Sequence, residues 1–181
     1  MLKTVLLTLI SVLTIVVVIG LCLPTHYAAS RSVVVHAPLE NVFALIGDLK
    51  RWPEWEPFST SDPTTKTTLG ATTTGVGASQ SWVGKGNTGR LKFTASDPKA
   101  GIEYDVVFTN GEHESPAKSW MRMSERSPGS VEVRWGMEGE MSMPMVGGFF
   151  ALIADERIGP IFEDGLEALK TRAEAKVAET K

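Results

Sequence analysis

The sequence predicts an α+β fold: a curved antiparallel sheet of about seven strands wrapped round one long C-terminal helix, preceded by one transmembrane helix. Three observations predict it. An uncharged apolar run fills Val5–Leu23, period-two alternation fills the middle of the chain, and a helical repeat fills residues 158–178. The apolar faces of sheet and helix must bury one another. A sheet that grips the helix does this and leaves a cavity between the two.

The N-terminal run predicts a membrane anchor over residues 1–23. As a helix, Val5–Leu23 would span roughly 28 Å, close to the hydrocarbon core of a bilayer. A cleavable signal peptide also begins with a positive charge such as Lys3, but its apolar region is only ~7–15 residues long. The residues that follow the run offer a poor cleavage site. We therefore expect a retained anchor, and the weak charge bias favours a domain on the outer, extracytoplasmic face.

Residues 24–30 are expected to be a linker, and residues 31–181 suit one domain with a sizeable core. The chain has 21 acidic and 18 basic residues, which argues against a nucleic-acid partner. Its one cysteine, Cys22, lies in the anchor, so the domain has neither a disulfide nor a thiol nucleophile. Three scattered histidines suggest no metal site, and we expect no cofactor. Nothing in the sequence indicates an oligomeric state.

The domain opens with a strand and a helix. Residues 31–36 form a β-branched run typical of a strand. Pro38 suits a first helical turn, and apolar residues at helical spacing as far as Leu49 predict an amphipathic helix over 38–50. Trp52–Pro57 ends that helix in a turn or a short second helix.

The middle of the chain predicts about six consecutive antiparallel strands. Apolar and polar side chains alternate along residues 90–95, 102–108 and 131–138, the pattern of a sheet with one wet face. Breaks that contain glycine, at 84–89 and elsewhere, supply hairpin turns.

The last third predicts a long helix over 158–178. Its apolar stripe consists of Ile158, Ile161, Phe162, Leu166, Leu169 and Ala173, which lie at helical spacing. Gly147–Ile153 would start the helix early, with a kink near Gly159-Pro160.

Several segments resemble the polyketide cyclase/dehydrase-type proteins of the SRPBCC (START and pollen-allergen-like) superfamily. The matching motifs are Arg31–Pro38, Trp52–Pro57, Gly75–Ala78, Val131–Glu140 and Ile158–Leu169, and the match covers residues 31–175. The resemblance implies a helix-grip fold with a hydrophobic ligand cavity, and many relatives carry an N-terminal anchor. It implies no single reaction, because members include lipid carriers, hormone receptors and ring-forming cyclases. No catalytic residue of a relative maps onto this chain.

Other candidate motifs have plainer explanations. Gly84–Gly89 fits the G-x-G-x-x-G pattern, but a strand rather than a helix follows it, which favours a hairpin over a phosphate loop. Adjacent residues such as Glu112-His113-Glu114 do not converge on one metal ion. Glu103 and Asp105 lie on the expected wet face. Exposed positions are also expected for Arg90, Arg122 and Arg134.

We therefore expect the domain to bind a hydrophobic or amphipathic small molecule, such as a lipid, between the sheet and the C-terminal helix. The expected lining residues are Trp82, Tyr104, Phe108, Trp135 and Phe162. One alternative is a cyclase/dehydrase-like enzyme in the same cavity, which a charged or tyrosyl group at the cavity base would favour. Another is a non-catalytic structural or partner-binding membrane protein, which a cavity below roughly 300 Å³ would favour. We identify no catalytic residue.

Overall fold

The computed structural model describes residues 2–57, 64–85, 88–111, 113–141 and 143–179. Its helices are α1 (Leu2–Cys22), α2 (Leu39–Ile46), the 3₁₀ helix η1 (Leu49–Glu54), α4 (Gly147–Leu152) and α5 (Ala154–Glu179). Its strands are β1 (His26–Val35), β2 (Lys66–Leu69), β3 (Ser79–Val83), β4 (Thr88–Asp97), β5 (Gly101–Asn110), β6 (His113–Ser127) and β7 (Ser130–Glu140).

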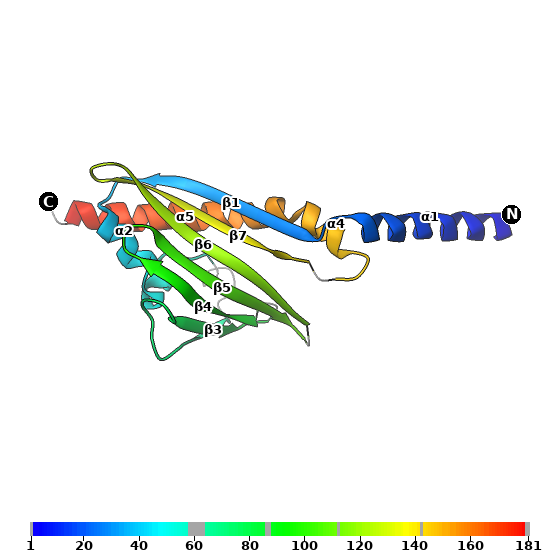
Figure 1. The fold of residues 1–181 in the computed structure, drawn as a ribbon, viewed down its shortest axis with the longest axis horizontal. Helices are drawn as coiled ribbons and strands as arrows, with labels where there is room; N and C mark the ends of the chain where they lie inside the picture. The colour runs from blue at the N-terminus through cyan, green and yellow to red at the C-terminus, as the bar shows by residue number, and fades with distance from the viewer. Residues whose placement is uncertain (1, 58–63, 86–87, 112, 142, 180–181) are drawn as a thin grey trace.

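The seven strands form one curved antiparallel sheet in the order β1-β7-β6-β5-β4-β3-β2 (Figure 1). Each strand from β2 to β7 pairs with the next along the chain, and β1 closes onto β7. The expected fold class, a sheet gripping a long C-terminal helix, is confirmed.

Residues 26–30, expected to be a linker, instead form the first half of β1. They pair with β7 from His26 opposite Glu140 to Ser30 opposite Gly136. The reason is a period of two: Tyr27 and Ala29 are buried, whereas their neighbours face solvent. Only Leu23–Thr25 therefore separates α1 from the sheet.

The helix expected over 38–50 divides into α2 and η1. α2 ends at Ile46 with Gly47 as its C-cap, and the Asp48 carboxylate then accepts a hydrogen bond from the backbone N–H of Lys50. Two buried indoles fix this bend. The Nε1 groups of Trp52 and Trp55 donate to the carbonyls of Ile46 and Leu45, which satisfies the unpaired end of α2.

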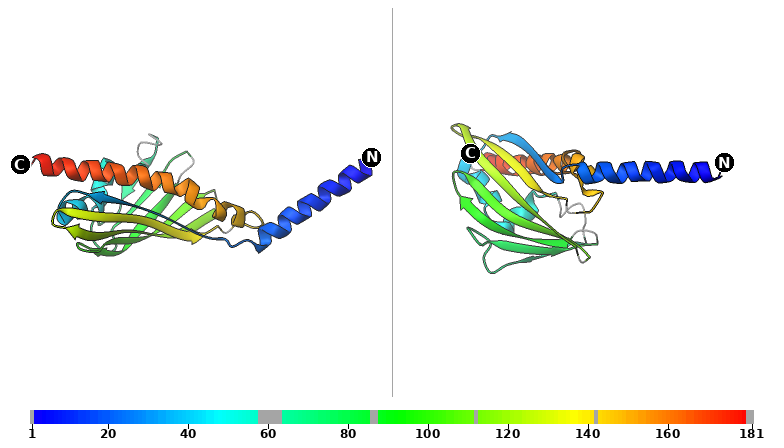
Figure 2. Two further views of the ribbon diagram at one scale, coloured as in Figure 1. Left: turned by 90° about the horizontal axis from the view of Figure 1, so that it is seen from above. Right: turned by 45° about the vertical axis from the view of Figure 1, so that its right-hand side comes forward.

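Helix α5 lies across the inner face of the sheet on the β1 and β7 side (Figure 2). It begins four residues before the expected start and contains Pro160, while α4 is a separate short helix. Phe162, Leu166 and Leu169 are fully buried. The Arg31 guanidinium on β1 donates to the carboxylates of Asp155 and Glu163, which joins the helix to the strand.

Helix α1 projects away from the domain, and the left view of Figure 2 shows that it does so at an angle to α5 (Figures 1 and 2). Most of its leucine, isoleucine and valine side chains are exposed, while Val17 is half-buried and Gly20 is buried. Among the described residues it is the one helix long and apolar enough to cross a bilayer. Both a membrane span and a signal sequence have this character.

Candidate functional site

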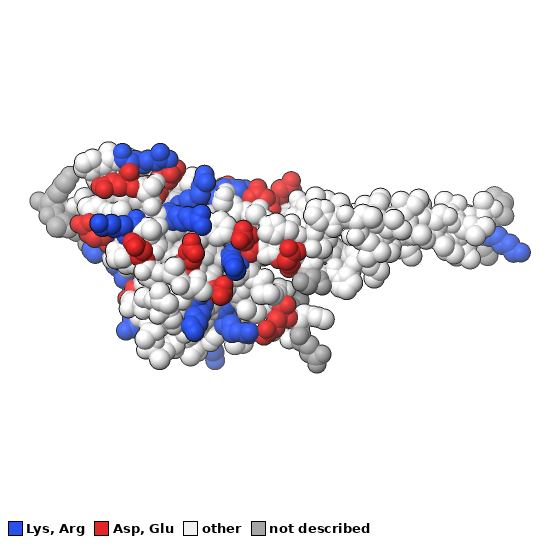
Figure 3. Space-filling view, in the orientation of Figure 1, with Lys and Arg blue, Asp and Glu red and all other residues white. Residues whose placement is uncertain are grey.

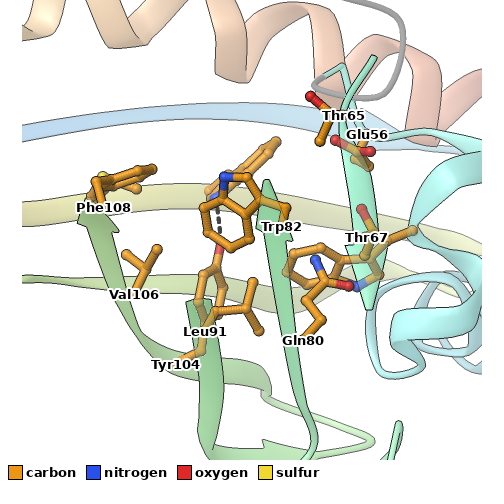
Figure 4. Close-up of a pocket in the computed structure, with 12 residues that line it drawn as sticks. Glu56, Thr65, Thr67, Gln80, Trp82, Leu91, Tyr104, Val106 and Phe108 are labelled. Carbon is orange, nitrogen blue, oxygen red and sulfur yellow. Dashed lines mark hydrogen bonds between the residues drawn. The ribbon is translucent and has the colours of Figure 1, made fainter. Parts of the chain in front are cut away.

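A cavity of about 110 Å³ lies against the concave face of the sheet, on the side that α5 does not cover. Figure 4 shows the side chains that surround it. They come from η1, from the second residue after it, from β2 and the residue before it, and from β3, β4, β5 and β7. The lining residues are Trp52, Glu56, Thr65, Thr67, Gln80, Trp82, Leu91, Tyr104, Val106, Phe108, Trp135 and Met137.

Four of the five side chains expected to line a cavity lie on this wall: Trp82, Tyr104, Phe108 and Trp135. Phe162 does not. It lies behind Trp135 and stacks on that indole, with ring centroids 4.4 Å apart. Among the described residues no side chain of α5 lines the cavity, which differs from the expected wall between sheet and helix. The reason is that α5 packs mainly on β1, at the far edge of the sheet from β2 and β3.

A buried polar cluster lies at the base of the cavity. The Trp135 Nε1 group donates to the Tyr104 hydroxyl oxygen at 3.1 Å and to the Ser119 Oγ at 3.3 Å. Ser119 Oγ in turn donates to the carbonyl of Gly136 at 2.8 Å. Burial of the phenol raises the pKa of Tyr104 to about 12. Near neutral pH this side chain is therefore a neutral hydroxyl rather than a base.

The Tyr104 ring packs among aromatic neighbours. Its centroid lies 5.5 Å from that of Trp52 and 6.0 Å from that of Phe93. The Trp55 ring meets the Trp135 ring edge to face, with ring centroids 5.7 Å apart. Edge and tilted ring contacts of this kind are stabilising, so the base of the cavity is a rigid, well-packed wall.

The opposite end of the lining is polar and consists of Glu56, Thr65, Thr67 and Gln80. In Figure 4 Glu56 and Thr65 lie on one side, and Phe108 lies at the other end of the cavity. The site is therefore amphipathic, with an aromatic end and a polar end.

Sequence reasoning missed most of the remaining wall. Leu91, Val106 and Met137 are on the same buried side of their strands as Tyr104 and Trp135, so the alternation could have identified them. Thr65 and Thr67 carried no such signal, because β2 is a short strand that is exposed at every position.

Strand directions place Trp82 and Phe108 at the end of the sheet from which α1 leaves, while β5 and β3 lie three and five strands across from β1. β1 begins just after α1, and the register of the sheet brings the end of β7 and the β5–β6 turn to the same end. Trp82 and Phe108 lie near the ends of β3 and β5, on that side. Their half-buried rings meet edge to face at 6.1 Å.

The other candidate motifs lie away from the cavity. The glycine motif lies between the end of β3 at Val83 and the first residues of β4, which begins at Thr88, as expected for a hairpin; residues 86–87 lie outside the described part of the chain. Glu112 is also outside it, and Glu114 pairs with the exposed Arg90. Glu103 pairs with Arg122 on the outer face. Arg134 is exposed as well.

Residues 27–174 match the family described as polyketide cyclase / dehydrase and lipid transport. The chain belongs to this family, whose fold forms a ligand-binding cavity. No protein of curated function matches the sequence.

Solved structures share the fold at low sequence identity. A Chromobacterium violaceum protein has a TM-score of 0.60 at 14% identity, over 81% of this chain and 96% of that one. A Thermobifida fusca protein has a TM-score of 0.58 at 21% identity, over 81% and 92%. The Zhui aromatase/cyclase of a Streptomyces species has a TM-score of 0.60 at 14% identity, over 84% and 96%.

Proposed function

We propose that this protein binds a hydrophobic or amphipathic small molecule, of the kind represented by a fatty acid, while α1 holds it on a membrane. The observation that carries the proposal is the cavity itself, with an aromatic end at Trp82 and Phe108 and a polar end at Glu56 and Thr65. A buried apolar site with a few convergent polar groups is typical of small-molecule binding. We further propose that α1 is retained and that the domain lies on the extracytoplasmic face.

The volume restricts the ligand. About 110 Å³ is below the roughly 300 Å³ of a site that encloses a drug-sized molecule, which by volume alone favours the structural or partner-binding function over enclosure of a whole ligand. An engineered apolar cavity of ~150 Å³ holds benzene. We infer that only a slender apolar group, such as the end of an acyl chain, enters the cavity and that the remainder stays at its mouth.

The position of the aromatic end supports exchange with a membrane. Trp82 and Phe108 face the end of the sheet where α1 leaves the domain. With only Leu23–Thr25 between α1 and β1, the first residue of β1 at this end lies within ~11 Å of chain from the helix. Thr67 pairs with Trp82 across β2 and β3, so the polar and the aromatic residues of the lining both lie toward this end of the sheet, where an amphipathic molecule leaving a bilayer would meet them.

Intrinsic fluorescence tests the proposal, because Trp82, Trp52 and Trp135 line the cavity. Palmitate added to the full chain in detergent should shift the tryptophan emission and raise the melting temperature. Trp82→Phe should lose part of the emission shift. Trp120→Phe should keep it, because Trp120 lies on the outer face under the Arg122 guanidinium.

A cavity-filling pair gives the matched control. Val106→Phe adds volume inside the cavity, whereas Val107→Phe adds the same group on the next residue of β5, which is not a lining residue. The first should abolish the response to palmitate and the second should retain it. If octanoate, laurate and palmitate all leave both the tryptophan emission and the melting temperature unchanged, the cavity does not bind such ligands and the domain has a filled core. The structural or partner-binding function then replaces the ligand-binding function.

A second candidate is a ring-forming reaction in the same cavity. The observation that favours it is the Tyr104 hydroxyl at the cavity base. A pKa of about 12 suits a hydrogen-bond donor to a substrate carbonyl, whereas a general base works best with a pKa near the operating pH. Turnover of a poly-β-ketone that Tyr104→Phe abolishes, without loss of binding, would establish the enzyme.

A further inference from the structure

An uncharged segment lies against the end of α1. Between Glu140 and Asp155 the chain has no charged residue. This apolar segment, residues 143–153, comprises the turn before α4, α4 itself and Ile153. Its exposed apolar side chains are Met143, Met145, Val146, Phe150, Leu152 and Ile153.

The apolar segment packs directly on α1. At Gly20 the α1 backbone meets the carbonyl of Met145 and the ring of Phe149, and a side chain there would collide with them. Gly148 of α4 lies against the Leu23 side chain. The turn passes through Met145 in the left-handed conformation, with φ 64°, which a side-chain-bearing residue seldom adopts. These contacts fix the height of the segment along α1.

That height lies within the apolar length of α1. Gly20 precedes the end of the run at Leu23 by about one turn, or ~4.5 Å at the helical rise of 1.5 Å per residue. If the apolar run fills the bilayer core, residues beside Gly20 lie at the boundary between headgroups and acyl chains. Interfacial segments bury their apolar side chains ~5–10 Å into this zone.

Exposure to water would be unfavourable for this surface. Phe150 is 47% exposed and Leu152 is 61% exposed in the structure. Figure 3 shows that the uncharged surface of α1 continues onto the adjoining end of the domain, while acidic and basic side chains are spread over the rest of that face. A contiguous apolar patch next to a membrane span indicates a membrane contact.

We propose that the apolar segment inserts into the interfacial layer of the membrane that α1 spans, so that the domain has a second lipid contact. The occupant of this surface is the lipid bilayer. This proposal rests on the membrane-spanning role proposed for α1. Contacts with the membrane through both α1 and the apolar segment fix the orientation of the domain relative to the bilayer. With α1 alone the domain could rotate about the end of that helix.

Depth-dependent fluorescence quenching tests the segment and the anchor separately. In a Cys22→Ser background, single cysteines replace Phe150 in α4, Val12 in α1 and Val76. Val76 is exposed and lies in the β2–β3 connection, at the end of the sheet remote from α1. Each full-length variant carries an environment-sensitive label in phosphatidylcholine vesicles that contain spin-labelled lipid.

The label at position 150 should lose most of its fluorescence to spin labels placed near the headgroups, while the label at 76 should keep it. A label at 150 that is quenched no more than the one at 76 overturns the proposal. The label at 12 then separates two causes. If it is quenched by spin labels deep in the bilayer, α1 spans the membrane without the segment; if it is not, the anchor fails as well.

Discussion

At the scale of single residues, the cavity base depends on one donor shared between two acceptors. Trp135 Nε1 donates both to Tyr104 and to Ser119. A buried polar atom without a partner is costly, so this cluster fixes the rotamers of the aromatic wall. The conformation of this wall decides whether an apolar group can enter.

The high pKa of Tyr104 is directly measurable because the chain has two tyrosines. Tyr27→Phe leaves Tyr104 as the one titrating phenol. Ultraviolet absorbance should give a tyrosinate midpoint about two pH units above that of free tyrosine, since burial raises the pKa to about 12. Circular dichroism at each pH shows whether the chain is still folded, and a midpoint near 10 in the folded protein would exclude a buried phenol.

The raised pKa of Tyr104 also makes the stability of the fold depend on pH. The unfolded chain releases the Tyr104 proton near pH 10 and the folded chain near pH 12. Between these values the folded state binds more protons, so the free energy of unfolding falls as the pH rises. Tyr104→Phe should make this decline shallower in urea unfolding of the full chain in detergent, and an equally steep decline would show that Tyr104 makes no contribution to it.

At the scale of elements, α5 stabilises the domain through its buried stripe. Leu166 is 2% exposed, whereas Ile161, expected on the apolar stripe, lies outside the buried face at 37% exposed. Leu166→Ala should lower the free energy of unfolding by about 2–5 kcal/mol, and Ile161→Ala by much less. Urea unfolding of both variants checks this, and equal effects would show that α5 does not cover the sheet through this stripe.

Helix α5 also holds η1 through one carboxylate. Glu54 accepts hydrogen bonds from Arg51 and Arg172, which lower the pKa of Glu54 to about 2. The stabilisation that the ionised Glu54 contributes through these two contacts is therefore complete above about pH 4.5, and it is lost as the pH falls toward 2. Glu54→Gln should cost at most about 1 kcal/mol at neutral pH and should weaken the acid sensitivity. Unfolding midpoints measured from pH 7 downward test it, and parallel curves for the two proteins would contradict it.

The sequence predicted these elements to different degrees, for physical reasons. Alternation revealed the central strands, and a helical stripe revealed α5, because both patterns follow from burial on one face. The sequence does not predict the first half of β1, because His26–Ser30 has only two buried positions, Tyr27 and Ala29. β2 has no buried position, so its sequence shows no alternation of apolar and polar residues that would predict a strand.

The position of the cavity was only partly predictable. Alternation showed that Tyr104 and Trp135 face inward, but it could not show that α5 lies across β1 and leaves the β2–β5 side open. That arrangement is set by long-range contacts, such as those of Arg31 with Asp155 and Glu163. Phe162 consequently supports Trp135 from behind, outside the lining.

At the scale of the whole molecule, the intact mass of protein extracted from membranes tests whether α1 is retained. The length of the apolar run and the poor cleavage site predict the full chain. A mature species that begins near Arg31 would show removal of a signal peptide. It would also remove the first half of β1, including the buried Tyr27 and Ala29, so we expect such a species to be poorly folded.

The central claim is that the membrane-held domain carries an apolar molecule in the cavity beside Trp82 and Phe108. Native mass spectrometry of the full chain, released from the membranes of the cells that produce it, tests this most directly. We predict the intact chain with one bound apolar molecule, present in Val107→Phe and absent in Val106→Phe. The bare mass for all three proteins, with no adduct after palmitate is added, would contradict it.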